Sequence, residues 1–171
     1  MIVATLTRVS RVLEMACLFI GALCLLYMVG VVGLNVLARI VFDVSDTAVN
    51  WMIPGAIEQV SYLLGIVVLA GLSASMAHGM IAVDFIVDRL PQFWKILFIR
   101  FWFLGVVAFA LVLSWLLYKD MLATFSRGEA SQDLRIPMYL IYGTYAVECL
   151  ALAIIALREA CINDGQHQEL S

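Results

Sequence analysis

Charged side chains are scarce in this sequence. Of its 171 residues only 13% are Asp, Glu, Lys or Arg, whereas 64% are hydrophobic, and the mean hydropathy is +1.03. Soluble domains carry about 25% charged and about 45–50% apolar residues. A soluble chain of this size cannot bury such an apolar excess, because small domains keep a large surface for their volume. The composition therefore excludes a soluble enzyme, a disordered tail and a secreted disulfide scaffold, and it places most of the chain in lipid.

Histidine and paired cysteine motifs are also nearly missing. The two histidines lie at the predicted end of a span (His78) and in the C-terminal tail (His167), whereas haem held between helices needs axial ligands inside the bundle. The four cysteines form no C-x-x-C pair, and the net charge of −3 has no basic concentration. No phosphate-binding loop or nucleophile–base pair is apparent. We therefore expect no catalytic residue, no metal, no cofactor and no nucleic-acid partner.

Long apolar runs make up most of the chain. Residues 15–38 carry no charged side chain and would span about 36 Å as a helix, which is enough to cross a bilayer and too long for a signal peptide. Three further runs lie at about 57–77, 93–118 and 136–157. The sequence predicts an all-α integral membrane protein with four transmembrane helices, in a single membrane domain over residues 1–171 with a polar tail at 159–171.

Two connecting stretches mix apolar and polar residues. Residues 44–53 include Asp46 and Trp51 and end before Pro54, and residues 80–90 place Asp84 and Asp88 four apart on one helix face. Both patterns favour short amphipathic helices that lie in the headgroup region; an ordinary structured loop is the alternative for each. Arg8 and Arg11 precede the first span, which favours an N-in, C-in orientation.

Charged residues within spans are costly in lipid and are functional candidates. Arg100 and Glu148 lie at similar predicted depths in the third and fourth spans, so we expect them to form an ion pair. A proton- or ion-carrying Glu148 is the rival interpretation.

Three polar residues flank the first connection. Asn35 and Arg39 end the first span on one face and Glu58 starts the second, so a cluster of the three would fix the helix ends. Contact of this cluster with a ligand or partner is the alternative. Glycine and other small residues in the first two spans suit either internal packing or a partner interface.

The order of several short motifs resembles the small membrane subunit (Q-type, DctQ-like) of tripartite ATP-independent periplasmic (TRAP) transporters. The matching features are Asn35-x-x-x-Arg39, Trp51 and Glu58, Leu64-Gly65, His78-Gly79-Met80-Ile81-Ala82-Val83-Asp84, Leu90-Pro91 and Leu134-Arg135-Ile136-Pro137. The resemblance covers residues 10 to 158. It departs from the family's Trp-x-Glu-Glu block, because six residues separate Trp51 from Glu58 and Gln59 follows.

This resemblance implies a multi-pass protein of the bacterial inner membrane that is not an enzyme and holds no substrate site of its own. Its partners would be a large elevator-type membrane subunit (M-type), a periplasmic substrate-binding protein and the lipid bilayer. The small subunit would brace the large subunit's scaffold in sodium-coupled uptake of an organic anion and would help to dock the binding protein. The anion, a C4-dicarboxylate, sialic acid or another organic acid, is not encoded here.

The candidate structural or partner-interface residues are Asn35, Arg39, Asp43, Asp46, Trp51, Glu58, His78, Asp84, Arg100, Pro137 and Glu148. Two other functions are compatible with four spans. One is a self-sufficient small four-helix exporter, which would need a deep coupling acid, and Glu148 is its one candidate. The other is the membrane anchor of a redox enzyme, which the lack of histidine within the spans disfavours.

Overall fold

The computed structural model describes residues 2–45, 53–76 and 91–162, and in this part of the chain four α-helices form the fold. They are α1 (Ile2–Val44), α2 (Ala56–Ser75), α4 (Gln92–Arg127) and α5 (Met138–Ile162). Each contains a segment that is long and apolar enough to cross a membrane. The predicted all-α membrane fold is confirmed.

The helices extend past most of the predicted span ends. α1 has 43 residues and α4 has 36, because the polar residues that flank the apolar runs continue the helix until a specific signal ends it. Gly128 is such a signal: it takes a left-handed conformation (φ 64°), and its N–H donates to the carbonyl of Phe125. Val44, where a new surface helix is predicted to begin, is instead the last residue of α1.

Most of the two predicted surface helices falls on residues 46–52 and 77–90, outside the described residues. Asp46, Trp51, His78 and Asp84 lie there as well. The surface helices and the roles of these four residues therefore stay predictions.

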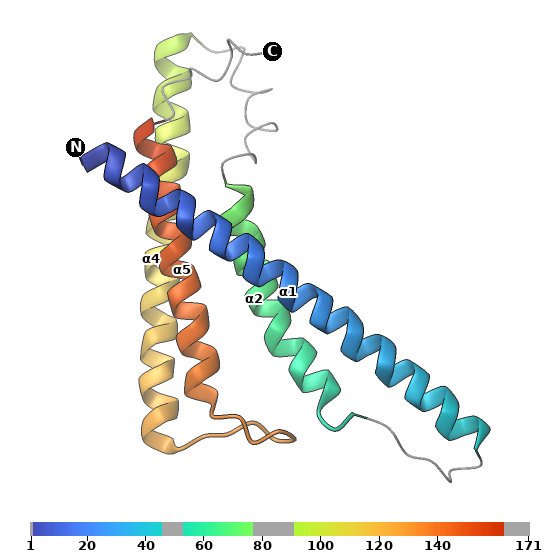
Figure 1. The fold of residues 1–171 in the computed structure, drawn as a ribbon. Helices are drawn as coiled ribbons and strands as arrows, with labels where there is room; N and C mark the ends of the chain where they lie inside the picture. Colours follow the sequence, from blue (N-terminus) through green and yellow to red (C-terminus); the bar gives the residue numbers. More distant parts are fainter. Residues whose placement is uncertain (1, 46–52, 77–90, 163–171) are drawn as a thin grey trace.

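α5 is the central helix of the bundle, and it contacts each of the other three. It pairs closely with α4, while α1 lies along α2 and crosses the α4–α5 pair obliquely (Figure 1). One end of the bundle holds the N-terminus and the last turns of α5, and we call it the terminal end. The other holds the connection between α4 and α5 and the start of α2, and we call it the loop end.

α4 and α5 are antiparallel, and small residues on α5 set their register. Phe103 of α4 is 2% exposed and packs in one cluster with Ala156 and Ala160 of α5. Towards the loop end, the Ser114 hydroxyl donates to the carbonyl oxygen of Ala146 across 3.0 Å. Alanine allows close approach of the helix backbones, which is the usual means of association between helices in lipid.

The glycines of α1 and α2 divide between internal and outer faces. A Cβ at Gly21 would lie 3.2 Å from the Cβ of Ala70, and one at Gly65 would lie 2.5 Å from the Tyr145 hydroxyl oxygen. Gly30 and Gly71 instead face open space. Internal packing therefore accounts for Gly21 and Gly65 and leaves the others on the outer surface.

Candidate functional site

The side chain of Glu58 ties the start of α2 to the connection between α4 and α5. Its Oε1 accepts from the backbone N–H of Gln132 (3.0 Å), and its Oε2 accepts from the N–H groups of Asp133 (3.1 Å) and Leu134 (3.2 Å). The Tyr62 hydroxyl, one turn further along α2, donates to Oε1 across 3.0 Å. Successive N–H groups that converge in this way form an anion-binding nest, and here the anion is a side chain of the same protein.

The connection itself is a short hairpin. Ala130 and Pro137 form an isolated antiparallel bridge. Ser131 donates its N–H to the Ile136 carbonyl (2.9 Å), and its hydroxyl accepts the Ile136 N–H (3.1 Å). Arg135 has a positive φ of 52°, which is uncommon for a residue with a Cβ. Pro137 therefore closes the hairpin just before α5 begins.

Gly55 brings α2 close to this hairpin. It has a φ of 66°, and a Cβ at this position would lie 2.8 Å from Leu134 Cγ and 3.2 Å from Asp133 Cβ. Both the backbone conformation and the lack of space favour glycine. α2 therefore begins directly beneath the N–H groups that Glu58 binds.

The predicted cluster of Asn35, Arg39 and Glu58 is wrong. Glu58 is bound to the hairpin, Arg39 is exposed, and the buried Oδ1 of Asn35 has no hydrogen-bond partner among the described residues. α1 is joined to α2 instead by Tyr27, whose hydroxyl donates to Gln59 Oε1 across 2.8 Å. The prediction failed because it considered only side-chain partners, whereas the carboxylate binds backbone N–H groups.

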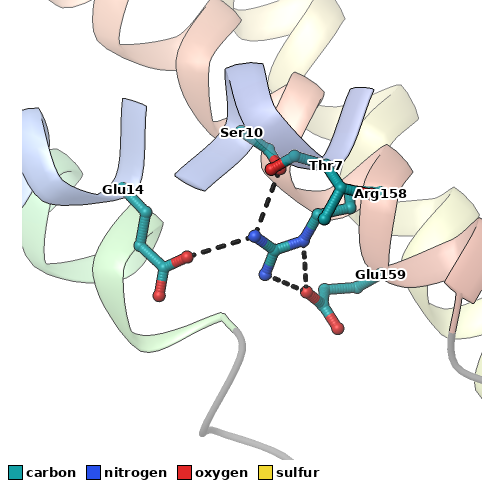
Figure 2. Close-up of polar contacts among 5 residues, drawn as sticks. All are labelled: Thr7, Ser10, Glu14, Arg158 and Glu159. Atoms are coloured by element: carbon teal, nitrogen blue, oxygen red, sulfur yellow. Dashed lines mark hydrogen bonds and ion pairs between the residues drawn. The ribbon is translucent and has the colours of Figure 1, made fainter. Parts of the chain in front are cut away.

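A second polar cluster ties α1 to α5 at the terminal end (Figure 2). The buried Arg158 donates from Nη1 to Ser10 Oγ (3.1 Å) and to Glu14 Oε2 (3.2 Å). Its Nε donates to Glu159 Oε1 across 2.8 Å, and Nη2 contacts the same oxygen. The Ser10 hydroxyl donates a hydrogen bond to the carbonyl oxygen of Thr7 across 3.2 Å. One guanidinium thus satisfies two carboxylates and a hydroxyl away from water.

Sequence reasoning missed this cluster, although a signal was present. Ser10 and Glu14 lie four residues apart and so share a face of α1. Arg158 lies at the end of the last span, and in an even-span bundle that end adjoins the start of the first span. The sequence therefore places the carboxylate of Glu14 at the same depth as the guanidinium of Arg158.

Tyr145 and Tyr62 extend the loop-end contacts into the bundle. The Tyr145 hydroxyl donates to the Tyr62 carbonyl oxygen across 2.7 Å, and its ring passes over Gly65. Neither tyrosine was a candidate from the sequence, because tyrosine is common at membrane interfaces. The two residues join α5 to the same turn of α2 that carries Glu58.

The predicted ion pair between Arg100 and Glu148 is not formed. In the register of α4 and α5, Arg100 lies near the last turn of α5 and Glu148 lies near the level of Ser114, so about 20 Å of helix separates them. Arg100 is exposed, whereas Glu148 is 8% exposed and its Oε2 has no hydrogen-bond partner among the described residues. The prediction measured depth from the start of the third span and the end of the fourth, and these two ends do not lie at the same height along the bundle.

One other candidate, Asp43, is placed without a described contact that would assign its role. Asp43 lies exposed on the last turn of α1, at the loop end. Within residues 2–45, 53–76 and 91–162, no group of three His, Cys, Asp or Glu side chains is arranged to hold a metal ion. The contacts of Glu58, Tyr145 and Arg158 join helices of this chain.

The family model described as "Tripartite ATP-independent periplasmic transporters, DctQ component" matches residues 28–163. This chain belongs to the DctQ family. No curated protein and no solved structure shows a significant match to it. The matched range contains Glu58, Glu148 and Arg158, and it begins after Ser10 and Glu14.

DctQ proteins are transporter components, not an enzyme family, and they act with a large membrane subunit and a periplasmic binding protein. The chain is therefore a TRAP transporter small membrane subunit and a multi-pass protein of the inner membrane. The resemblance found from the sequence motifs is confirmed.

Replacement of Glu58 by alanine should loosen the hairpin. The three N–H groups that donate to the carboxylate would then exchange their hydrogens with solvent faster, because they would lose their intramolecular acceptor. Hydrogen–deuterium exchange of the peptide covering residues 129–138 measures this. Glu129→Ala is the matched control, since among the described residues its side chain pairs with the exposed Arg127 across 2.6 Å and not with the hairpin N–H groups. Equal exchange in the two variants would contradict the role given to Glu58.

Replacement of Arg158 by methionine should destabilise the protein by about 3–5 kcal/mol, because Glu14 and Glu159 would stay buried without a cation. Thermal unfolding in detergent measures the loss, and Glu14→Gln in the same chain should restore part of it. The control is Arg127→Met, where an exposed pair contributes only about 0–1 kcal/mol. A loss no larger than that of the control would show that the cluster is not a tie.

Proposed function

We propose that this chain is the small subunit of a sodium-coupled TRAP transporter for organic anions, that it braces the scaffold of the large elevator-type subunit, and that it helps to dock the periplasmic substrate-binding protein. The observation that carries the proposal is that two charged side chains bind partners inside the subunit and thereby join its helices. Glu58 and Arg158 are bound within the subunit, at opposite ends of it. Such ties fix the mutual geometry of helices, which is the property a brace requires.

The outer surface supports the same role. Large apolar side chains on α1 and α4 are exposed, among them Leu26 (67%), Phe101 (75%) and Phe109 (64%). In a membrane this surface meets either lipid or another apolar protein. The chain therefore presents a wide apolar exterior on a bundle whose helices are joined by Glu58 and Arg158.

α1 gives the brace an unusual reach. Its 43 residues extend about 65 Å at helical rise, about twice the hydrocarbon thickness of a bilayer. A helix longer than the bilayer accommodates by tilting, among other ways, and α1 crosses the other helices obliquely (Figure 1). A tilted α1 would cover a broad strip of a partner subunit.

The loop end suits the docking role. With Arg8 and Arg11 in the cytoplasm, as the positive-inside rule favours, the loop end faces the periplasm. Asp43, Asp133 and Arg135 are exposed there, and the hydrogen bond from the Asp133 N–H to Glu58 fixes the backbone of Asp133. A preorganised charged surface speeds encounter with a soluble partner and selects its orientation.

Reconstitution tests the proposed transport role. Proteoliposomes that hold this chain together with its cognate large subunit should accumulate the organic anion when the binding protein and a sodium gradient are supplied. Proteoliposomes with this chain alone should show no uptake, because the chain would contribute no substrate site. Uptake by the chain alone would contradict the proposal and favour the small-exporter interpretation, and haem absorbance of the purified chain would favour the redox anchor.

Reversal of the charge at Asp43 tests docking. Asp43→Lys should reduce uptake at low ionic strength, while the complex of small and large subunits stays intact on size-exclusion chromatography. The neutral Asp43→Asn should give a smaller loss. Both losses should shrink as salt is raised, because exposed charges are screened beyond about 10 Å at 0.1 M ionic strength. Dissociation of the complex by Asp43→Lys would assign this residue to subunit assembly instead.

A further inference from the structure

The loop-end half of α5 has one face that none of the other three described helices covers. Towards the terminal end, alanines of α5 are enclosed by α4, α1 and α2. Towards the loop end, Leu140, Thr144 and Val147 are exposed. They form the floor of a groove of about 810 Å³, with Leu122 and Phe125 of α4 on one side. α1 and α2 supply the opposite wall of this groove.

Glu148 lies in the wall of this groove and is a charged residue type in an otherwise apolar lining. It is 92% buried, since only 8% of its surface is exposed, and its Oε2 has no hydrogen-bond partner among the described residues. The carboxyl groups of Glu58 and Glu14 are both bound within the chain, so Glu148 differs from them. A polar group in lipid without a partner is costly, so a donor that reached this carboxyl group through the groove wall would stabilise it.

We propose that a transmembrane helix of the large subunit occupies this groove and places a hydrogen-bond donor against Glu148. The inference rests on the proposed function, because it names the place on this chain where the large subunit binds. The lining is apolar, as a helix in lipid requires. Thr144 is exposed and short, and it would let the partner's backbone approach closely. The interaction of donor with carboxylate would fix the depth and rotation of the partner helix.

Two other occupants fit the groove less well. A lipid acyl chain would fill its apolar part but would bring no donor to Glu148. A second copy of this chain, related by two-fold symmetry through the groove, would bring the two Glu148 side chains towards each other. The carboxylate is thus complementary to a donor-bearing helix and to neither alternative.

The first test fills the groove. This chain, affinity-tagged and in full length, is co-expressed with its cognate large subunit, and the large subunit retained after detergent washing is quantified. Thr144→Trp should reduce retention roughly tenfold by occupying the seat. The matched control is Val112→Trp, since Val112 is 59% exposed on α4 and lies outside the groove lining. Retention equal to wild type with Thr144→Trp, or an equal loss with Val112→Trp, would overturn the inference.

The second test changes the acceptor. Glu148→Leu should reduce retention roughly threefold to tenfold, as expected for one interhelical hydrogen bond in a membrane, and Glu148→Gln should lose less because its amide oxygen still accepts. Thermal unfolding of the chain without its partner separates binding from folding. Glu148→Leu should leave the midpoint unchanged or raise it, because it removes an unpartnered carboxyl group. A lowered midpoint with unchanged retention would overturn the inference and give Glu148 a structural role.

The remaining outcomes distinguish the two levels of the proposal. If wild-type chain retains no large subunit, the proposed function and this inference fail together. If wild type and both groove variants retain it equally, only the inference fails. Native mass spectrometry of the complex tests for the two other occupants, a phospholipid and a second copy of this chain. Loss of a bound phospholipid, or of a second copy of this chain, on Thr144→Trp with full retention of the large subunit would overturn the inference in favour of that occupant.

Discussion

The carboxylate of Glu58 and the three backbone N–H groups that it accepts hold the loop end of this subunit together. A hairpin at a membrane surface must satisfy its backbone donors, and Gln132, Asp133 and Leu134 offer three in succession. Because the acceptor belongs to α2, these N–H groups are satisfied within the protein when α2 lies beneath the hairpin. Tyr62 and Tyr145 then join α5 to the same turn. Glu58 therefore joins α2 to the connection between α4 and α5.

The two ends of the bundle are joined by different chemistry. At the terminal end, Arg158 pairs with carboxylates from α1 and α5, and alanines of α5 pack closely against α4. At the loop end, the Glu58 carboxylate binds backbone N–H groups, and one face of the loop-end half of α5 stays uncovered by the described helices. Both ties are internal, so they hold the helices in place without a partner. A partner helix can pack against this uncovered face of α5 without breaking either tie.

Hydropathy was sufficient to predict the four helices, because lipid requires long apolar segments whatever their contacts. Only some of the polar contacts could be predicted from the sequence. Arg100 and Glu148 were paired on depth alone, and the depth was wrong because α4 and α5 are offset along each other. The partner of Glu58 could not be predicted from residue types, since every residue except proline offers a backbone N–H. The contact of Arg158 with Glu14 was within reach, because opposite charges at the same end of two spans limit the choices.

The central position of α5 has a consequence for biosynthesis. A chain enters the membrane from its N-terminus, so α1, α2 and α4 insert before the helix that contacts all three. Until α5 arrives, Glu14 has no cation and the hairpin has no following helix, although the nest can already form on α2. Assembly of this subunit therefore completes only with its last span, and a chain released before residue 158 would leave three inserted helices without the helix that joins them.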